Sequence, residues 1–208
     1  MKGLKNTRHE VKMEWDRLSR QIEFLVEIDR LKGIVRQSLL MDGSRQENSA
    51  EHSWHLALLA MVLAEHSRVP VNLSKVLKMV LVHDLVEIDA GDTYCYDEEA
   101  NRDKAERETR AADRIFGLLP HDQAQEFRSL WEEFESAATP EALFAAALDR
   151  LQPLVNNSRS GGVKWQEHGI RKEQVFSRNS PMARGAPDLW EYAQTIIEEA
   201  IAKGWIAG

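Results

Sequence analysis

The sequence predicts an all-α protein, a helical bundle that forms a single domain. Along most of its 208 residues, apolar side chains recur at spacings of three and four, the period of amphipathic helices. Runs of Val, Ile and Thr that alternate with polar residues, the pattern typical of strands, do not occur in it. It also lacks internal repeats and low-complexity tracts, which argues against a solenoid.

Two helices are expected in the N-terminal third, with an irregular segment between them. The first ends near Gly33, and the turn signal Asp42-Gly43 marks residues 35–45 as irregular. The second is expected over residues 47–67. The apolar repeat of the first helix consists of Trp15, Leu18, Ile22, Leu25, Val26, Ile28 and Leu31. The apolar face of the second consists of Trp54, Leu58, Met61 and Val62.

A third helix, over residues 76–88, is apolar nearly all round and is therefore expected at the centre of the bundle. A loop over 89–98 follows it. Further helices are expected over residues 99–117, 121–136, 140–157 and 187–203, with a break at 158–162. Because no linker divides the chain, residues 1–208 are expected to form one domain, with a core over about 15–158 and a helical tail over 159–208.

Charge and cysteine content limit the classes of partner and compartment. A net charge of −7 and a pI near 5.6 argue against a nucleic-acid polymer, because such polymers bind basic surfaces. A small anionic substrate stays compatible, since a metal and one local arginine can override the overall sign. Cys95 is the single cysteine, so no intrachain disulfide can form, which fits a reducing compartment. Without an apolar signal region or a membrane-length apolar stretch, the chain is expected to be cytoplasmic and not membrane-bound.

The strongest local signal for chemistry is His83-Asp84, within the apolar third helix. Burying an ionised carboxylate without a partner is costly, so a compensating group is expected. A divalent cation would compensate the charge and use both ligand types. Glu87 follows three residues after Asp84, so all three side chains are expected on one side of the helix. A buried histidine–aspartate pair is the alternative.

Two further positions favour the metal. His52 opens the second helix, and Asp149 interrupts an apolar helix whose small residues permit close approach. For Asp149, the alternative is a salt bridge to a distant arginine. His55 shares a face with His52, but it is expected to pack in the interior or to contact a metal ligand, and not to bind the metal itself. His66 lies about 21 Å along the helix from His52, at about 1.5 Å per residue, so it is expected to be a surface histidine.

A loop acid follows the third helix in Gly91-Asp92-Thr93. The glycine fits a helix stop. Asp92 is then expected above the metal, and the Thr93 hydroxyl is expected to contact the substrate. The alternative for Asp92 is a solvated turn aspartate. A glycine-rich phosphate loop does not occur in the sequence, so phosphate recognition is expected to depend on the metal and an arginine.

The order His52, His83-Asp84, Asp149 resembles the HD-domain superfamily of metal-dependent phosphohydrolases. Over about residues 15–155, further motifs resemble its 5′-deoxynucleotidase branch. These motifs are Arg36, Glu47-Asn48-Ser49-Ala50-Glu51-His52-Ser53, His83-Asp84-Leu85-Val86-Glu87 and Gly91-Asp92, and the tail around Arg178-Asn179-Ser180-Pro181 is similar to bacterial HD hydrolases. The resemblance implies the HD-type helical bundle.

The resemblance also implies a function and residue roles. It implies an enzyme that removes the 5′-phosphate from (deoxy)nucleoside monophosphates, uses a divalent metal ion (Co, Mn, Zn, Fe or Mg) and forms a homodimer. Glu87 and Asp92 would handle protons or a further metal, and Arg36 would hold the substrate phosphate. The implied metal ligands are His52, His83, Asp84 and Asp149.

The sequence departs from the branch near the arginine. Gln37 stands where some relatives have a tryptophan that helps to exclude the ribose 2′-hydroxyl, and one extra residue separates Arg36 from His52. The preference between deoxyribose and ribose substrates therefore stays open.

Alternatives of other classes are less well supported. Hydrolases of guanosine polyphosphates place Glu and Asp consecutively, whereas Ile88 separates Glu87 from Asp89 here. A two-metal cyclic-nucleotide phosphodiesterase would need further histidines. A catalytically silent regulatory module with a metal would not need Glu87, Asp92 and Arg36. A purely structural bundle, with histidines and aspartates paired internally, would contain no metal.

Overall fold

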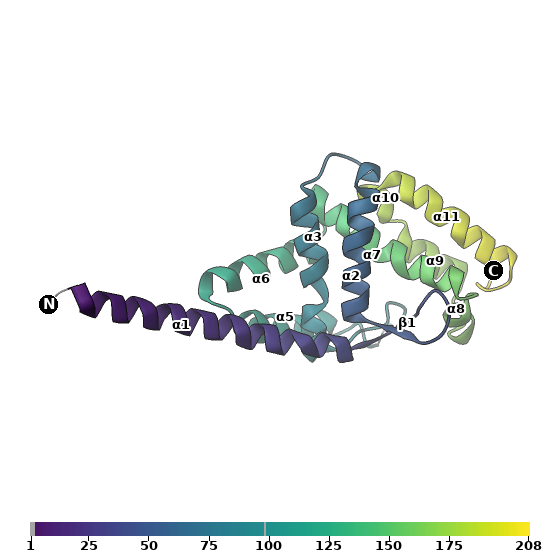
Figure 1. Cartoon of the computed structure of the whole chain (residues 1–208). Helices are drawn as coiled ribbons and strands as arrows, with labels where there is room; N and C mark the ends of the chain where they lie inside the picture. Colours follow the sequence, from purple (N-terminus) through teal and green to yellow (C-terminus); the bar gives the residue numbers. More distant parts are fainter. Residues whose placement is uncertain (1–2, 98) are drawn as a thin grey trace.

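The computed structural model describes residues 3–97 and 99–208, and helices dominate it (Figure 1). The prediction of an all-α bundle is confirmed. The longer helices are α1 (Gly3–Ile28), α2 (Ser49–Leu63), α3 (Leu73–Val82), α5 (Lys104–Phe116), α6 (His121–Ser136), α7 (Pro140–Arg159) and α11 (Pro187–Ala202). The short ones are α4 (Glu87–Ala90), α8 (Val163–Glu167), α9 (Lys172–Asn179) and α10 (Met182–Gly185). The 3-10 turns are η1 (Asp29–Gly33), η2 (Ala64–His66) and η3 (His83–Val86).

Helix α7 is the centre of the bundle, and α2, α3, α10 and α11 pack around it. A Cβ atom added at Gly185 of α10 would lie 2.2 Å from the carbonyl oxygen of Leu143 in α7, so this close approach requires glycine. The prediction that the apolar third helix is central was wrong. Helix α3 packs on one side of α7 and leaves Leu81 48% exposed.

The segment expected to be irregular, residues 35–45, contains part of a short antiparallel hairpin. Strand β1 (Val35–Leu39) pairs with β2 (Gln46–Asn48), and Gly43 between them has a φ of 73°. This positive φ fits the turn signal in the sequence. The strands lack apolar alternation because neither of their faces is fully buried. The hairpin carries Arg36 and leads directly into α2.

The third helix predicted over 76–88 is broken in the structure. Helix α3 ends before His83, the tighter turn η3 follows, and α4 completes the segment. With three residues per turn, a 3-10 turn places residues three apart on one side. His83, Asp84 and Glu87 are all buried. The apolar pattern could not reveal the break, because the same residues would be buried in a continuous helix.

Helix α1 projects beyond the body of the molecule (Figure 1). Most of its apolar repeat is exposed. Polar side chains attach it instead: Arg17 pairs with Asp122 of α6, and Arg20 donates to carbonyls at the end of α5. Phe24 packs edge-on against Phe127. The exposed apolar residues of α1 are Trp15, Leu18, Ile22, Leu25 and Val26.

The apolar face predicted for the second helix is also exposed. Its residues are Trp54, Leu58, Met61 and Val62, with Trp54 at 62% and Val62 at 70% exposure. The core side of α2 consists instead of His52, Leu56 and Ala60, which are fully buried. Because α2 is apolar on both sides, the period of the pattern alone could not identify the side that faces the core.

The C-terminal tail contains more helix than the sequence predicts. Helices α8, α9 and α10 are four to eight residues long, which is too short to show a helical repeat. Trp165, Val175 and Ile197 of the tail belong to the same apolar cluster as Leu56 and Leu148. Among the described helices, none has the length and apolar character that a membrane span needs.

Candidate metal centre

Side chains from α2, η3 and α7 meet around one point. The Nε2 atoms of His52 and His83 lie 3.1 and 3.7 Å from Oδ1 of Asp149. One ligand atom of each residue lies within 4.8 Å of the others. Both imidazoles are buried. The structure therefore brings three of the four predicted ligands together, although they come from distant parts of the chain.

Asp84, the fourth predicted ligand, borders this group. Its Oδ1 lies 3.0 Å from Nε2 of His83, and its Oδ2 lies 3.9 Å from Nε2 of His52. The same Oδ2 accepts a hydrogen bond from Nη1 of Arg36 at 2.7 Å. Asp84 thus faces the same centre and shares one oxygen with the arginine.

The start of α2 fixes the place of His52. Asn48 forms a capping box: its side chain accepts from the backbone N–H of Glu51, whose carboxylate accepts from the backbone N–H of Asn48. The Ser49 hydroxyl donates to Oε2 of Glu87 at 2.6 Å and joins the first turn of α2 to α4. His52 therefore enters the interior one turn after a well-defined helix start.

His83 provides a test of whether these residues fit a metal ion. Its Nδ1 lies 2.9 Å from the carbonyl oxygen of Val80, and because a carbonyl only accepts, Nδ1 holds the ring proton. In the neutral imidazole, Nε2 then carries a lone pair, and this atom is buried with no hydrogen-bond partner among the described residues. This lone pair faces the carboxylates of Asp84 and Asp149, an arrangement that a divalent cation stabilises. The nitrogen and oxygen donors fit such an ion.

The charges of the group stabilise one another. Burial opposes the ionised forms of Asp84 and Asp149, but contacts with neighbouring groups outweigh it and lower both pKa values: His83 and Arg36 for Asp84, His52 and His83 for Asp149. Burial would lower the pKa of His83, but the two carboxylates outweigh it and raise that pKa. Both aspartates are therefore anionic and suited to a cation.

Two further acids lie beside Arg36. Its Nη1 lies 3.9 Å from Oε1 of Glu87 and 3.8 Å from Oδ1 of Asp92. Burial, followed by the charge of Asp84, raises the pKa of Glu87 well above its usual value, and burial also raises the pKa of Asp92. The side chain of Asp92 is only 12% exposed, so it is not a solvated turn aspartate.

A cavity lies next to this group. The predicted residues Arg36, Asp92 and Thr93 line it together with Gln37. The Thr93 hydroxyl accepts a hydrogen bond from Nη2 of Arg107 at 3.1 Å, which fixes its position at the wall. The residue that departs from the branch, Gln37, therefore lines the same cavity as Arg36.

Other residues of the same wall received no role in the sequence analysis, although Arg178 belongs to the tail motif named there. Lys104 and Arg178 are its further basic residues, with Lys104 paired to Glu108 at 2.8 Å, and Tyr94 is an aromatic one. Nη2 of Arg178 lies 4.0 Å from Oδ2 of Asp149, farther than either imidazole, so an arginine salt bridge is the weaker of the contacts of Asp149. Single residues on separate elements show no pattern in sequence, and the fold alone gathers them.

The histidines predicted to lie outside the metal group do so. His55 contacts Gln152 instead, with Nδ1 3.3 Å from Nε2 of the amide. His66 lies near Asp188 of α11, with 3.4 Å between Nδ1 and Oδ2. Neither belongs to the group of His52, His83 and Asp149.

Comparisons of sequence identify the family of the chain. The family model of the HD domain matches residues 28–190. The human protein named 5′-deoxynucleotidase HDDC2 is 30% identical over 138 residues, which cover 66% of this chain. The chain thus spans just under two thirds, 66%, of that relative. The Schizosaccharomyces pombe (strain 972 / ATCC 24843) protein named 5′-deoxynucleotidase hdd1 is 26% identical over 190 residues, 89% of this chain and 86% of that protein.

Solved structures show the same fold. A crystal structure described as a predicted metal-dependent phosphohydrolase from Magnetospirillum magnetotacticum MS-1 is 49% identical, with a TM-score of 0.89 over 92% of this chain and 96% of that one. An HD-domain phosphohydrolase from Listeria innocua shares the fold alone, at 18% identity and a TM-score of 0.57 over 87% and 85% of the two chains. Since the family model spans α2, η3 and α7, the chain belongs to the HD-domain family.

Proposed function

We propose that this protein is a metal-dependent phosphomonoesterase that removes the 5′-phosphate from deoxynucleoside or nucleoside monophosphates. The observation that carries the proposal is the meeting of the His52 and His83 Nε2 atoms at Asp149, with the Arg36 guanidinium beside them at Asp84. The names of the human and fission-yeast relatives and of the Magnetospirillum structure support it.

We propose His52, His83, Asp84 and Asp149 as the metal ligands. Imidazole nitrogen among the donors favours Co, Mn, Zn or Fe over Mg, which prefers oxygen. When bound, the ion lowers the pKa of a water molecule and polarises a phosphate oxygen.

Arg36 binds the phosphate in this proposal. Its contacts with Asp84, Glu87 and Asp92 all run through Nη1, and the guanidinium carries further N–H donors in a planar fork. Such a fork matches the spacing of phosphate oxygens. The buried position holds the arginine in place before the substrate arrives.

Glu87 and Asp92 handle protons at the leaving 5′-oxygen or at the attacking water. Each carboxyl group lies within 4 Å of Nη1 of Arg36, so a phosphate bound there is within their reach. Ser49 orients Glu87 through its hydroxyl. Thr93, held by Arg107, contacts the substrate from the cavity wall.

The cavity also fits the rest of a nucleotide. Lys104 and Arg178 offset the negative charge of the phosphate locally, although the whole chain carries a net charge of −7. Tyr94, which is only partly buried, offers flat apolar surface to a nucleobase.

Phosphate release from a substrate panel tests the proposal. The panel contains dAMP, AMP, their base variants and a guanosine polyphosphate, each with Mn, Co, Zn and Mg. We expect release from the monophosphates with a transition metal and none after chelation. Turnover of the guanosine polyphosphate alone, or turnover that survives chelation, would contradict it.

We further propose that the protein is a homodimer whose interface includes the outward face of α1. Its exposed residues Trp15, Leu18, Ile22 and Leu25 repeat at alternating spacings of three and four, which pair helices in coiled coils. A contiguous apolar stripe exposed to water on a projecting helix is typical of a surface that another molecule covers. The same stripe on a second copy complements it about a twofold axis.

Sedimentation velocity tests the dimer. The double substitution of Leu18→Glu with Ile22→Glu places four carboxylates in the interface and should give monomers. Val69→Glu makes the same chemical change at an exposed residue before α3 and should leave the dimer intact. A monomeric wild type, or an unaffected double variant, would contradict this interface.

A further inference from the structure

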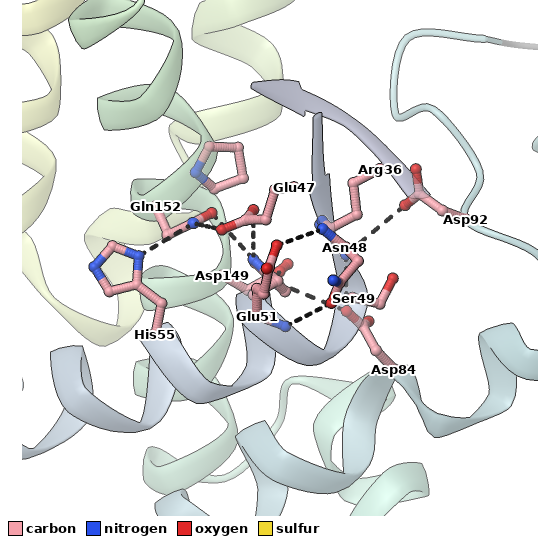
Figure 2. A network of polar contacts seen from close by, with 12 residues as sticks. Arg36, Glu47, Asn48, Ser49, Glu51, His55, Asp84, Asp92, Asp149 and Gln152 are labelled. Atoms are coloured by element: carbon pink, nitrogen blue, oxygen red, sulfur yellow. Dashed lines mark hydrogen bonds and ion pairs between the residues drawn. The ribbon is translucent and has the colours of Figure 1, made fainter. Parts of the chain in front are cut away.

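A buried network of polar side chains adjoins the Nδ1 atom of His52, whereas its Nε2 atom faces Asp149. Figure 2 shows Gln152, Glu47 and His55, which belong to this network. Nδ1 of His52 lies 3.0 Å from Oε1 of Gln152. Nε2 of Gln152 donates to Oε1 of Glu47 at 2.6 Å and lies 3.3 Å from Nδ1 of His55. Glu47, His52 and Gln152 are each no more than 3% exposed. This row of side-chain contacts therefore leads from His52 through Gln152 of α7 to Glu47 at the end of the β hairpin.

The Glu47 carboxylate, at the end of this network, determines which atom donates in each of its hydrogen bonds. A carboxylate only accepts, so the group of Gln152 that faces Glu47 is the NH2 group, and the amide carbonyl faces His52. A carbonyl also only accepts, so Nδ1 of His52 donates and holds the ring proton. Nε2 of His52 then carries its lone pair toward Asp149, 3.1 Å away.

We infer that Gln152 is a positioning residue that, backed by Glu47, holds His52 in the tautomer and orientation that bind the metal. This inference rests on the proposed function. His83 obtains the same constraint from the backbone of Val80, whereas His52 depends on side chains from other elements. Removal of such a partner of a metal-bound histidine lowers metal affinity by about 10- to 100-fold.

A swap of the two polar groups gives the sharpest test. Gln152→Glu places a second carboxylate against Glu47, at a contact that is 2.6 Å in the wild type, and should weaken metal binding. The double variant with Glu47→Gln restores the order of donor and acceptor, because the carboxylate introduced at position 152 accepts from both His52 and the new amide. It should regain most of the affinity of the wild type, with nearly the same side-chain volumes throughout.

The measurement is calorimetric titration of the metal-free full chain with Mn²⁺. We expect the dissociation constant to rise about 10- to 100-fold in Gln152→Leu and in Gln152→Glu. Glu198→Gln serves as the control, because Glu198 is an exposed residue of α11 that belongs neither to the metal group nor to the cavity wall. Its dissociation constant should match that of the wild type.

A second readout follows the ring proton directly. In the zinc-loaded wild type, the Nδ1 proton of His52 should be visible by NMR and exchange slowly with water, and in Gln152→Leu it should exchange fast. A role of Gln152 in stability alone would lower the melting temperature but leave the dissociation constant and the exchange unchanged, which would overturn the inference.

The possible failures are distinguishable. A wild type that binds no divalent metal would contradict both the proposed function and this inference. If the wild type binds metal but the double variant binds it no more tightly than Gln152→Glu alone, the positioning role of Gln152 is contradicted. The proposed function is not affected by that result.

Discussion

Nη1 of Arg36 donates to Oδ2 of Asp84 over 2.7 Å, although 48 residues separate them in the sequence. Both side chains are nearly buried, at 12% and 11% exposure. The contact ties the β hairpin to the turn η3 and compensates the charge of each group inside the protein. It also places the arginine proposed to bind phosphate directly beside a proposed metal ligand.

Arg36→Lys is expected to lower kcat/KM by about 100-fold or more, because a lysine has no planar fork with which to hold Asp84 and a phosphate together. Metal affinity should change little, since the four proposed ligands remain. Steady-state kinetics with dAMP and a Mn²⁺ titration check both parts. Arg114→Lys, at a surface ion pair of α5, is the matched control. An unchanged kcat/KM in Arg36→Lys would exclude Arg36 from substrate binding.

Asp149→Ala is expected to abolish stabilisation by metal, because both imidazoles lose the carboxylate around which they meet. A ligand at about 100 times its dissociation constant stabilises a protein by about 2.7 kcal/mol. Thermal melts with and without Mn²⁺ should therefore separate for the wild type and coincide for the variant. Asp188→Ala removes an exposed aspartate of α11 and should keep the full metal-dependent shift. A shift of normal size in Asp149→Ala would contradict the proposed centre.

Glu87→Gln is expected to lower kcat by about 10²- to 10⁴-fold while metal affinity stays within a few-fold. The amide keeps the size of the side chain and can still accept from Ser49, but it cannot exchange a proton with the substrate. Single-turnover kinetics at saturating Mn²⁺ isolate the chemical step. If kcat is retained, Asp92 remains the candidate for this role.

The proximity of His83, Asp84 and Asp149 was predictable because each of these polar residues interrupts an apolar stretch of the sequence. His83, Asp84 and Asp149 are polar residues within apolar helices, and burying them alone is costly, so their chemistry shows in the sequence. Gln152 carries the same signal, a polar residue one turn after Asp149, but its meaning depends on facing His52 and Glu47 across two other elements. That arrangement exists only in the folded chain.

The side of a helix that meets the core was less predictable. The repeat of Trp15, Leu18 and Ile22 correctly indicated a helix, yet Arg17 and Arg20 attach α1 to the body. Periodicity reports that one face is apolar and leaves open whether this chain or another molecule covers it. The same ambiguity led to the wrong face for α2.

The close contact of α10 with α7 yields a prediction about stability. Gly185→Ala puts a Cβ atom within 2.2 Å of the Leu143 carbonyl oxygen, which belongs to the backbone and cannot turn aside. We expect a loss of about 1–3 kcal/mol in the free energy of unfolding, measured by urea denaturation. Gly33→Ala is the control, because nothing lies within 4 Å of its added Cβ. That substitution should be neutral or stabilising by up to about 1 kcal/mol, since it restricts the unfolded chain. Equal effects of the two substitutions would show that α10 can move away from α7 at no cost, and that glycine is not needed there.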